Sequence, residues 1–356
     1  MKNIRLKLKA ISPIHTGSGE VFEPTNFIID NQVLYHFRDE DFLESLNKEK
    51  TQQFLNIVNE MKEDSFVKIH KFIKDNKELA KQIAFLKIMT TKGIQKEYDS
   101  ILGNIVNFEG KGKNIKKVFN QFEIQRVQRK QLKSKNGFAY VGYIPGSSLK
   151  GSISTAYREF IYQKYGEKKV EELFENPRNM KNLLFRFFKV SDSRVIKPKS
   201  MIGFAVNKER FEDNNLGPFT FIEVLHKDSE YIVDISYDEK KINFDDIIKA
   251  CNNHYEPIFD EMLDSENENI SEYFSDEVYE YYSNLKLKQN QFLLRVGKHS
   301  GARAVTIDGL RNISVRENKR KFLRNQTEET TTWLFGSSKT SNTNLLPFGW
   351  IIAEII

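Results

Sequence analysis

Six histidines are the side chains in this 356-residue sequence that come closest to enzyme chemistry. An imidazole can act as a general acid or base near neutral pH. No two of them have the His-x-x-His or His-Glu-x-x-His spacing that brings two imidazoles to one zinc ion. They are His15, His36, His70, His226, His254 and His299. We therefore expect no metal site and no cofactor.

His15 is the strongest catalytic candidate because it lies in a glycine-containing loop, residues 12–19. Its imidazole could transfer a proton during RNA cleavage by a 2′-hydroxyl group. Such a reaction needs a second proton-transfer group and an oxyanion stabiliser, and the sequence identifies neither. A hydrogen bond to nucleic acid, stacking on a base and a structural role are the alternatives. The same alternatives hold for His299, and we predict no catalytic residue.

A turn followed by a helix is predicted at residues 143–156. Pro145 and Gly146 favour the turn, and the doubled serine, Ser147 and Ser148, could cap the helix. Apolar residues recur with helical spacing on one face, and a separate polar face carries Lys150, Ser154 and Arg158. An ordinary capped helix is the simplest interpretation.

The start of this helix also favours a phosphate, because unpaired N–H groups and the positive end of the helix dipole lie there. Gly146 and Gly151 would let a nucleic-acid backbone come close. The stretch is not a Walker loop, since Lys150 precedes the second glycine instead of following it. Asp192, in a tight loop after a predicted strand, is expected to hold its own turn.

Residues 111–135 carry nine Lys or Arg and only one acid. The Asn-Gly pair at 136–137 predicts a basic β-hairpin over about 119–144 that projects from a sheet. A run of charge is usually a solvated face. The lack of balancing acids and the proximity to the predicted helix start favour nucleic-acid binding instead. The candidate residues here are Arg126, Arg129, Lys130 and Lys133.

Basic residues recur between 295 and 324, with nine Lys or Arg against two acids. Gly297 and Gly301 bracket a loop after an apolar run, much as Gly17 and Gly19 follow the first strand. Residues 209–280, in contrast, hold 21 acids and five bases, and we expect them to face solvent or a protein neighbour. The net charge of +6 conceals this segregation.

The composition predicts a globular protein of two ordinary domains, since 39% of the residues are hydrophobic. The single cysteine, Cys251, excludes an internal disulfide framework and suits a reducing cytoplasm. No apolar run reaches the roughly 18 residues of a membrane span. We expect a soluble, cytoplasmic protein with no membrane partner.

The hydrophobic periodicity predicts the α+β class. The expected elements are a strand at 4–10, a strand pair at 27–29 and 33–37, a helical region at 39–102, strands at 183–190 and 200–206, a hairpin of 219–225 with 231–235, a helix at 244–263 and a closing strand at 348–352.

Five short motifs in this order resemble the RAMP superfamily of CRISPR ribonucleoproteins. Their order and the chain length are most similar to those of the subunit that caps the 3′ end of the CRISPR RNA in the type III-A (Csm) effector complex. The motifs are residues 12–19 (SPIHTGSG), 144–151 (IPGSSLKG), 190–193 (VSDS), 297–301 (GKHSG) and 346–350 (LPFGW).

The resemblance implies two ferredoxin-like (RRM-like) RAMP domains. The first would cover 1–165, with a helical insertion at about 39–102, and the second 166–356, with the acidic helical segment. It implies a non-catalytic subunit that binds the 3′ part of the CRISPR RNA, contributes to guide maturation and contacts the adjacent backbone and small subunits. The basic hairpin would be a thumb-like arm lying across the guide and the target RNA.

Three alternatives remain open. They are a RAMP-type endoribonuclease that processes precursor CRISPR RNA through His15, an end subunit of another type III complex, and a protein scaffold whose basic regions only neutralise its acidic segment. The predicted RNA-binding residues are His15, Gly17, Ser18, Gly19, Arg126, Arg129, Lys130, Lys133, Gly146, Ser147, Ser148, Lys150, Gly151, Arg158, Arg295, Gly297, Lys298, His299, Gly301 and Arg303.

Overall fold

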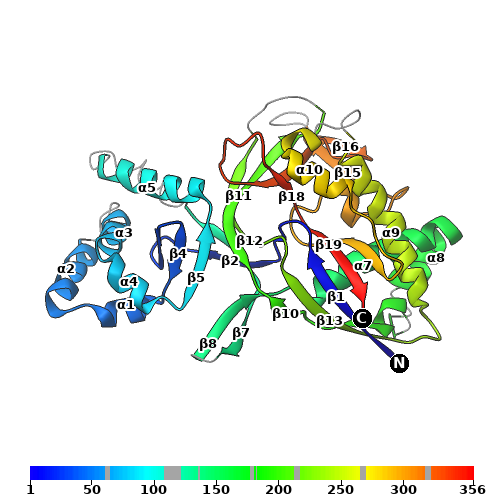
Figure 1. Ribbon diagram of the computed structural model, residues 1–356, viewed down its shortest axis with the longest axis horizontal. Helices are drawn as coiled ribbons and strands as arrows, with labels where there is room; N and C mark the ends of the chain where they lie inside the picture. The colour runs from blue at the N-terminus through cyan, green and yellow to red at the C-terminus, as the bar shows by residue number, and fades with distance from the viewer. Residues whose placement is uncertain are drawn as a thin grey trace.

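Two large curled sheets form the centre of the molecule, with helices at either end, and the two termini lie close together (Figure 1). The computed structural model describes residues 1–60, 65–107, 122–134, 137–176, 180–181, 183–211, 217–264, 270–316 and 322–356. The α+β class predicted from the sequence is confirmed. Within the described residues, no helix is long and apolar enough to cross a bilayer.

The first sheet is built around its N-terminal strand, β1, which lies between β13 and β19 and is antiparallel to both. Its order is β10-β13-β1-β19-β14, and β9 also pairs with β13. The strands are β1 (Lys2–Ala10), β9 (Phe188–Val190), β10 (Arg194–Lys197), β13 (Glu230–Tyr237), β14 (Gln291–Arg295) and β19 (Trp350–Ile355). β10, β13, β1 and β19 have the order and directions of the four strands of a ferredoxin-like βαββαβ unit, and β14 extends the sheet beyond β19.

Helices α7 (Gly146–Tyr165) and α9 (Phe244–Glu261) are the two helices of that unit, and they pack against each other and the sheet. Leu6 and Leu8 of β1 point into the shared core, while Lys7 and Lys9 alternate with them on the opposite face. This alternation is the one expected of a half-buried strand. The predicted helices at 147 onward and at 244–263 are confirmed.

The second sheet is made of segments inserted between the elements of the first. Its order is β2-β6-β12-β11-β5-β4-β3, with β17 paired to β11 and to β18. The strands are β2 (Gly17–Phe22), β3 (Phe27–Asp30), β4 (Val33–His36), β5 (Leu86–Thr90), β6 (Ile124–Val127), β11 (Ser200–Glu209), β12 (Phe219–Leu225), β17 (Thr331–Gly336) and β18 (Leu346–Pro347).

The predicted helical insertion is confirmed only in part. A small separate core holds its first four helices beside β3 and β4. β5 then interrupts the helical region, because Lys87 and Met89 are exposed and alternate with buried neighbours, the period of a strand. The helices are α1 (Asp39–Ser45), α2 (Lys48–Asn59), α3 (Ser65–Asp75), α4 (Lys77–Ile83) and α5 (Lys92–Asn107).

The basic hairpin projects from the body of the molecule as a two-stranded arm (Figure 1). Its strands are β7 (Arg129–Ser134) and β8 (Gly137–Gly142), and the predicted Asn-Gly turn at 136–137 lies partly outside the described residues. The remaining elements are α8 (Glu167–Val170), η1 (Glu171–Glu175), η3 (Leu184–Phe187), η4 (Ser271–Tyr273), α10 (Asp276–Ser283), η5 (Arg303–Val305), β15 (Ile313–Arg316) and β16 (Phe322–Gln326).

Two strand predictions are wrong. The hairpin of 219–225 with 231–235 does not form, because β12 pairs with β11 in the second sheet whereas β13 pairs with β1 in the first. The turn between them carries the chain from one sheet to the other, alongside the segment that follows β1. The strand expected at 183–190 is mostly the 3₁₀ helix η3, and only β9 is extended.

Both sheets take strands from either side of residue 165. The ferredoxin-like unit begins with β1 at the N-terminus and ends with β14 and β19 near the C-terminus. A boundary between independent domains at 165 stays a prediction, but the sheets do not divide there.

Candidate nucleic-acid interface

The two glycine loops lie directly against each other. The Lys298 amide donates a hydrogen bond to the His15 carbonyl over 2.9 Å. The Gly349 amide, from the motif at 346–350, donates to the Pro13 carbonyl over 2.8 Å. Gly297 has a φ of 92°, and a Cβ atom there would lie 2.5 Å from the His15 carbonyl oxygen. Glycine at 297 is therefore what allows the two loops to touch.

The base of the hairpin arm belongs to the same surface. The Gln128 amide donates to the Thr16 carbonyl over 2.7 Å, and the Thr16 hydroxyl donates to the Tyr143 carbonyl over 3.0 Å. The Tyr143 amide in turn donates a hydrogen bond to the Gln128 carbonyl over 3.1 Å. The first glycine loop, the start of the arm and the turn before α7 are thus joined by hydrogen bonds.

The N-terminus of α7 is bound by Asp192 and not by a serine. The Gly146 amide donates to Asp192 Oδ1 over 2.8 Å, and the N-cap residue, Pro145, makes no side-chain cap. The predicted caps by Ser147 and Ser148 are therefore wrong. The carboxylate occupies the positive end of the helix dipole, where a phosphate was predicted.

Cationic side chains line the surface that these elements form. Lys298 is exposed and reaches Gln125 over 2.8 Å. In the described part of the chain Lys150 has no carboxylate partner, and partial burial lowers its pKa. Lys130 lies 5.2 Å from the Tyr143 ring and donates to the Ser193 carbonyl. Lys133 is exposed farther along the arm.

Arg126 and the exposed glycines extend this surface beside β2. The Arg126 guanidinium pairs with Glu20 over 3.0 Å and lies 4.8 Å from the centre of the Phe22 ring. The side chain of Ser18 donates to the Arg126 carbonyl over 3.3 Å. A Cβ atom at Gly19 or at Gly151 would meet nothing within 4 Å, so the backbone is open to a ligand at both positions.

Three predicted RNA contacts are buried within the protein instead. Arg129 forms an ion pair with the fully buried side chain of Glu223, and burial lowers its pKa to about 10. Arg295 is buried, donates to the Phe348 carbonyl over 3.0 Å and lies against the Trp350 ring.

Arg303 is the third, because it is buried in η5 and pairs with Glu261. Arg158 stays partly exposed on α7 and pairs with Glu175 over 2.9 Å, as Arg126 pairs with Glu20. The interpretation of Arg129, Arg295 and Arg303 as surface residues is wrong. Their partners are distant in the sequence, so the basic runs alone could not reveal them.

The two loop histidines are also internal. His15 is 1% exposed and shares a 2.7 Å hydrogen bond, through Nδ1, with the Glu223 carbonyl. Burial, and secondarily Lys298, lower its pKa to about 4. His299 packs between Trp333 and Phe348, with ring centres 4.6 and 5.1 Å away, and burial lowers its pKa to about 3. Both imidazoles are neutral at pH 7.

Comparison with protein families gives a match to the RAMP superfamily over residues 7–339. The chain belongs to the RAMP superfamily. This confirms the family resemblance of the five sequence motifs. No curated protein matches the chain.

Two solved structures share the fold of this chain over nearly their whole length. A chain of the Csm–crRNA–target RNA ternary complex of a type III-A CRISPR–Cas system, determined by cryo-EM, is 15% identical with a TM-score of 0.62. The match covers 99% of this chain and 100% of that one. The crystal structure of T. onnurineus Csm5 is 13% identical with a TM-score of 0.51, covering 97% and 99%.

Glu223 is a site residue of this RAMP protein that the sequence analysis missed. Its carboxylate accepts a hydrogen bond from the Val127 amide over 3.1 Å in addition to pairing with Arg129. Its carbonyl binds His15, so one residue of β12 ties the arm to the first glycine loop. The sequence signal that could have revealed Glu223 is an acidic residue between apolar neighbours in a predicted strand. Such a residue is expected to be buried, and a buried charge requires a partner.

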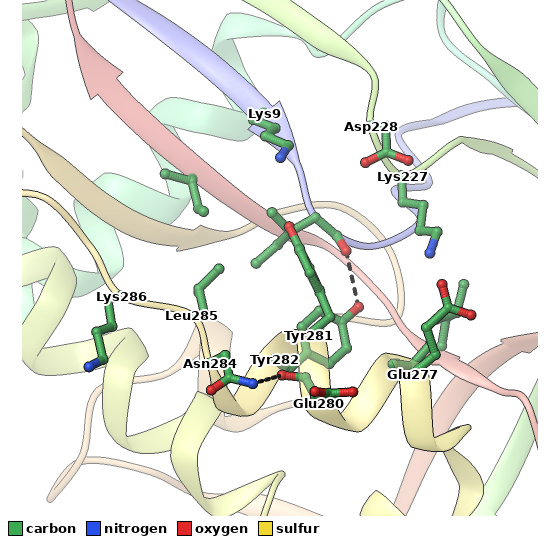
Figure 2. Close-up of a pocket in the computed structure, with 14 residues that line it drawn as sticks. Lys9, Lys227, Asp228, Glu277, Glu280, Tyr281, Tyr282, Asn284, Leu285 and Lys286 are labelled. Carbon is green, nitrogen blue, oxygen red and sulfur yellow. Dashed lines mark hydrogen bonds between the residues drawn. The ribbon is translucent and has the colours of Figure 1, made fainter.

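A hollow elsewhere on the RAMP protein has a different character. It lies between α10 and the open face of the first sheet and has a volume of about 610 Å³ (Figure 2). Lys9, Lys227 and Lys286 line it together with Asp228, Glu277 and Glu280, so its charges balance. It does not continue the cationic surface. In the described residues no group of three or more His, Cys, Asp or Glu is arranged to hold a metal ion.

Proposed function

We propose that this RAMP protein is a non-catalytic RNA-binding subunit of a type III-A CRISPR effector complex. In this proposal it binds the 3′ part of the CRISPR RNA, caps the backbone filament beside the adjacent backbone and small subunits, and contributes to guide maturation. The observation that carries it is the meeting of both glycine loops, the turn before α7 and the arm on one hydrogen-bonded surface.

The charge of that surface supports a nucleic-acid ligand. Five cations lie along it, against the carboxylates of Glu20 and Asp192. Lysines and open glycine backbone contact phosphates and sugars and carry little sequence information. Binding should therefore tolerate many sequences, as a guide-holding subunit requires. The cations are Arg126, Lys130, Lys133, Lys150 and Lys298.

The end-to-end similarity to a chain of the Csm–crRNA–target RNA complex supports the choice of complex. RNA and neighbouring Csm subunits are the partners that this similarity suggests. The similarity to Csm5 points to the same complex.

The state of the histidines supports the non-catalytic part of the proposal. A general acid or base must reach the proton that it transfers, and a general acid must also carry a proton near pH 7. His15 is buried and neutral, and its Nδ1 is committed to Glu223. No observation favours an endoribonuclease acting through His15.

Charge reversal on the surface tests the proposal. Lys150→Glu with Lys298→Glu should weaken binding of single-stranded guide RNA at least tenfold, measured by fluorescence anisotropy at fixed salt. Lys168→Glu with Lys240→Glu is the matched control, because both lysines are exposed on α8 and in the loop before α9. Equal affinities of the two double variants would refute RNA binding at this surface. Crosslinking to 3′-labelled guide RNA in the assembled complex tests the capping position.

A further inference from the structure

A second hollow lies at the base of the hairpin arm, between β8, β5 and the beginning of β11, and has a volume of about 520 Å³. Figure 1 places β5 to one side of the arm and α7 to the other. The hollow is thus across the arm from the turn before α7. Its size is within the range of small-ligand sites.

The arm separates the two regions by strand alternation. Arg129 and Lys130 are consecutive in β7, so their side chains point to opposite faces. Lys130 reaches Ser193 beside the α7 turn, whereas Arg129 lines the hollow with Tyr140 of the paired strand. An RNA strand on the cationic surface that crossed the arm would next meet this hollow.

The lining is basic at the rim. Among the described residues that line the hollow, none is acidic. Lys87 and Lys199 are exposed and have no carboxylate partner in the described part of the chain. The charge of Arg129 is already balanced by Glu223, so the positive charge that no carboxylate balances comes from the two lysines. The Lys87 ammonium group also lies 5.4 Å from the centre of the Tyr35 ring on β4.

The inner lining is apolar and aromatic. Met89 and Met201 are directly paired between β5 and β11, and Met89 is 54% exposed although it is a large apolar side chain. The Tyr140 ring is held at the wall by an edge contact with Phe85, with ring centres 5.2 Å apart. Thioether and aromatic surfaces are the groups on which a nucleobase stacks.

We propose that this hollow holds one nucleotide of the bound RNA. The base lies against Tyr140 and the methionine pair, and the phosphate binds Lys87 and Lys199. The inference rests on the proposed RNA binding and adds a nucleotide site on the far side of the arm. Apolar lining beneath two unbalanced lysines matches a base joined to a phosphate, and backbone phosphates alone would not require it.

Photocrosslinking locates the nucleotide directly. Guide RNA substituted with 4-thiouridine is bound to the full-length protein, irradiated and mapped by mass spectrometry. We expect crosslinked peptides containing Tyr140 or Met201 in the wild-type protein, a loss of this crosslink in Lys87→Glu with Lys199→Glu, and its retention in Lys168→Glu with Lys240→Glu. Crosslinks confined to residues 17–19 and to the region of Lys150 and Lys298 would overturn this site and leave RNA binding intact. Absence of RNA binding by the wild-type protein would instead overturn the proposed function.

Affinity measurements distinguish the contribution of the phosphate contacts to binding from that of the base contacts. Lys87→Glu with Lys199→Glu should weaken RNA binding about tenfold and reduce the slope of log K against log[salt] by about 0.7 for each phosphate that the lysines no longer neutralise. Tyr140→Leu keeps an apolar side chain against Phe85, and should weaken binding about tenfold without changing that slope. Thermal melts check that each variant is folded. Variants that bind RNA as tightly as the control pair overturn the proposal.

Discussion

Glu223 shows how a single buried residue determines what its neighbours do. Its carboxylate binds Arg129 and the Val127 amide, and its carbonyl binds His15. The first glycine loop and the arm are consequently fixed to β12 before any ligand binds. Pre-arranged contacts of this kind reduce the ordering cost of binding.

Removal of the Glu223 charge should destabilise the protein. Glu223→Gln keeps the shape of the side chain but leaves the Arg129 guanidinium buried without its counter-ion. Breaking one side of a buried pair costs about 3–5 kcal/mol in the free energy of unfolding. Urea denaturation measures it. Glu20→Gln, which breaks the exposed pair with Arg126, is the control and should cost less than about 1 kcal/mol. Similar losses for both would contradict the structural role of Glu223.

Acidification should destabilise the fold through its buried histidines. Burial lowers the pKa of His15 to about 4 and those of His36, His70 and His299 to about 3. Below pH 6.5 the unfolded chain binds protons that the folded chain does not, so stability falls from pH 6.5 toward pH 3–4. At pH 5 each imidazole should cost about 2 kcal/mol. Thermal melts at pH 7 and 5 measure the loss, and an unchanged or higher melting temperature at pH 5 would contradict it.

At the scale of elements, Asp192 couples the stability of α7 to the charge of the cationic surface. Asp192→Asn keeps an oxygen that can accept from Gly146 and removes the negative charge beside Lys130. RNA affinity should rise several-fold with little loss of stability. Asp192→Ala should instead lose about 1 kcal/mol, the usual cost of a lost cap. Anisotropy and urea denaturation give the two readouts, and weaker RNA binding by Asp192→Asn would place the phosphates elsewhere.

Individual elements were predictable where the hydrophobic period was uninterrupted, as in β1, in the β3–β4 pair and in α9. Strand partners were predictable across the short turns of β3–β4 and β7–β8 but not between β12 and β13. The alternation in 231–235 is the same whichever sheet the strand joins, and a turn signal does not say which sheet the chain enters next.

Prediction of the candidate RNA-binding residues was limited in the same way, because their partners are distant in the sequence. The sequence marked both glycine loops, the arm and the turn before α7 as candidate RNA-binding segments, and hydrogen bonds in the structure join these segments. It could not separate Arg129 from Lys130, which are neighbours in the chain. Their difference depends on Glu223, 94 residues away from Arg129, and only the paired strands bring that carboxylate to one of the two.

At the scale of the whole molecule, the chain passes repeatedly between its two sheets. β1 needs β13 on one side and β19 on the other, and β11 of the second sheet pairs with β5, β12 and β17. Each sheet therefore requires segments from both halves of the sequence. Folding of one half without the other would leave long unpaired strand edges.

Fragments 1–165 and 166–356 should consequently fail to fold alone. The first would contain β1 without either partner strand, and the second would have β13 and β19 with a gap between them. We expect each separate fragment to aggregate or to lack a cooperative melt by circular dichroism. Co-expressed fragments are the control, because together they restore every strand pair and should co-purify with a cooperative transition. A dispersed NMR spectrum and a cooperative melt for 1–165 alone would instead support the domain boundary that the sequence suggested, and the shared sheets would then join two units that are each stable by themselves.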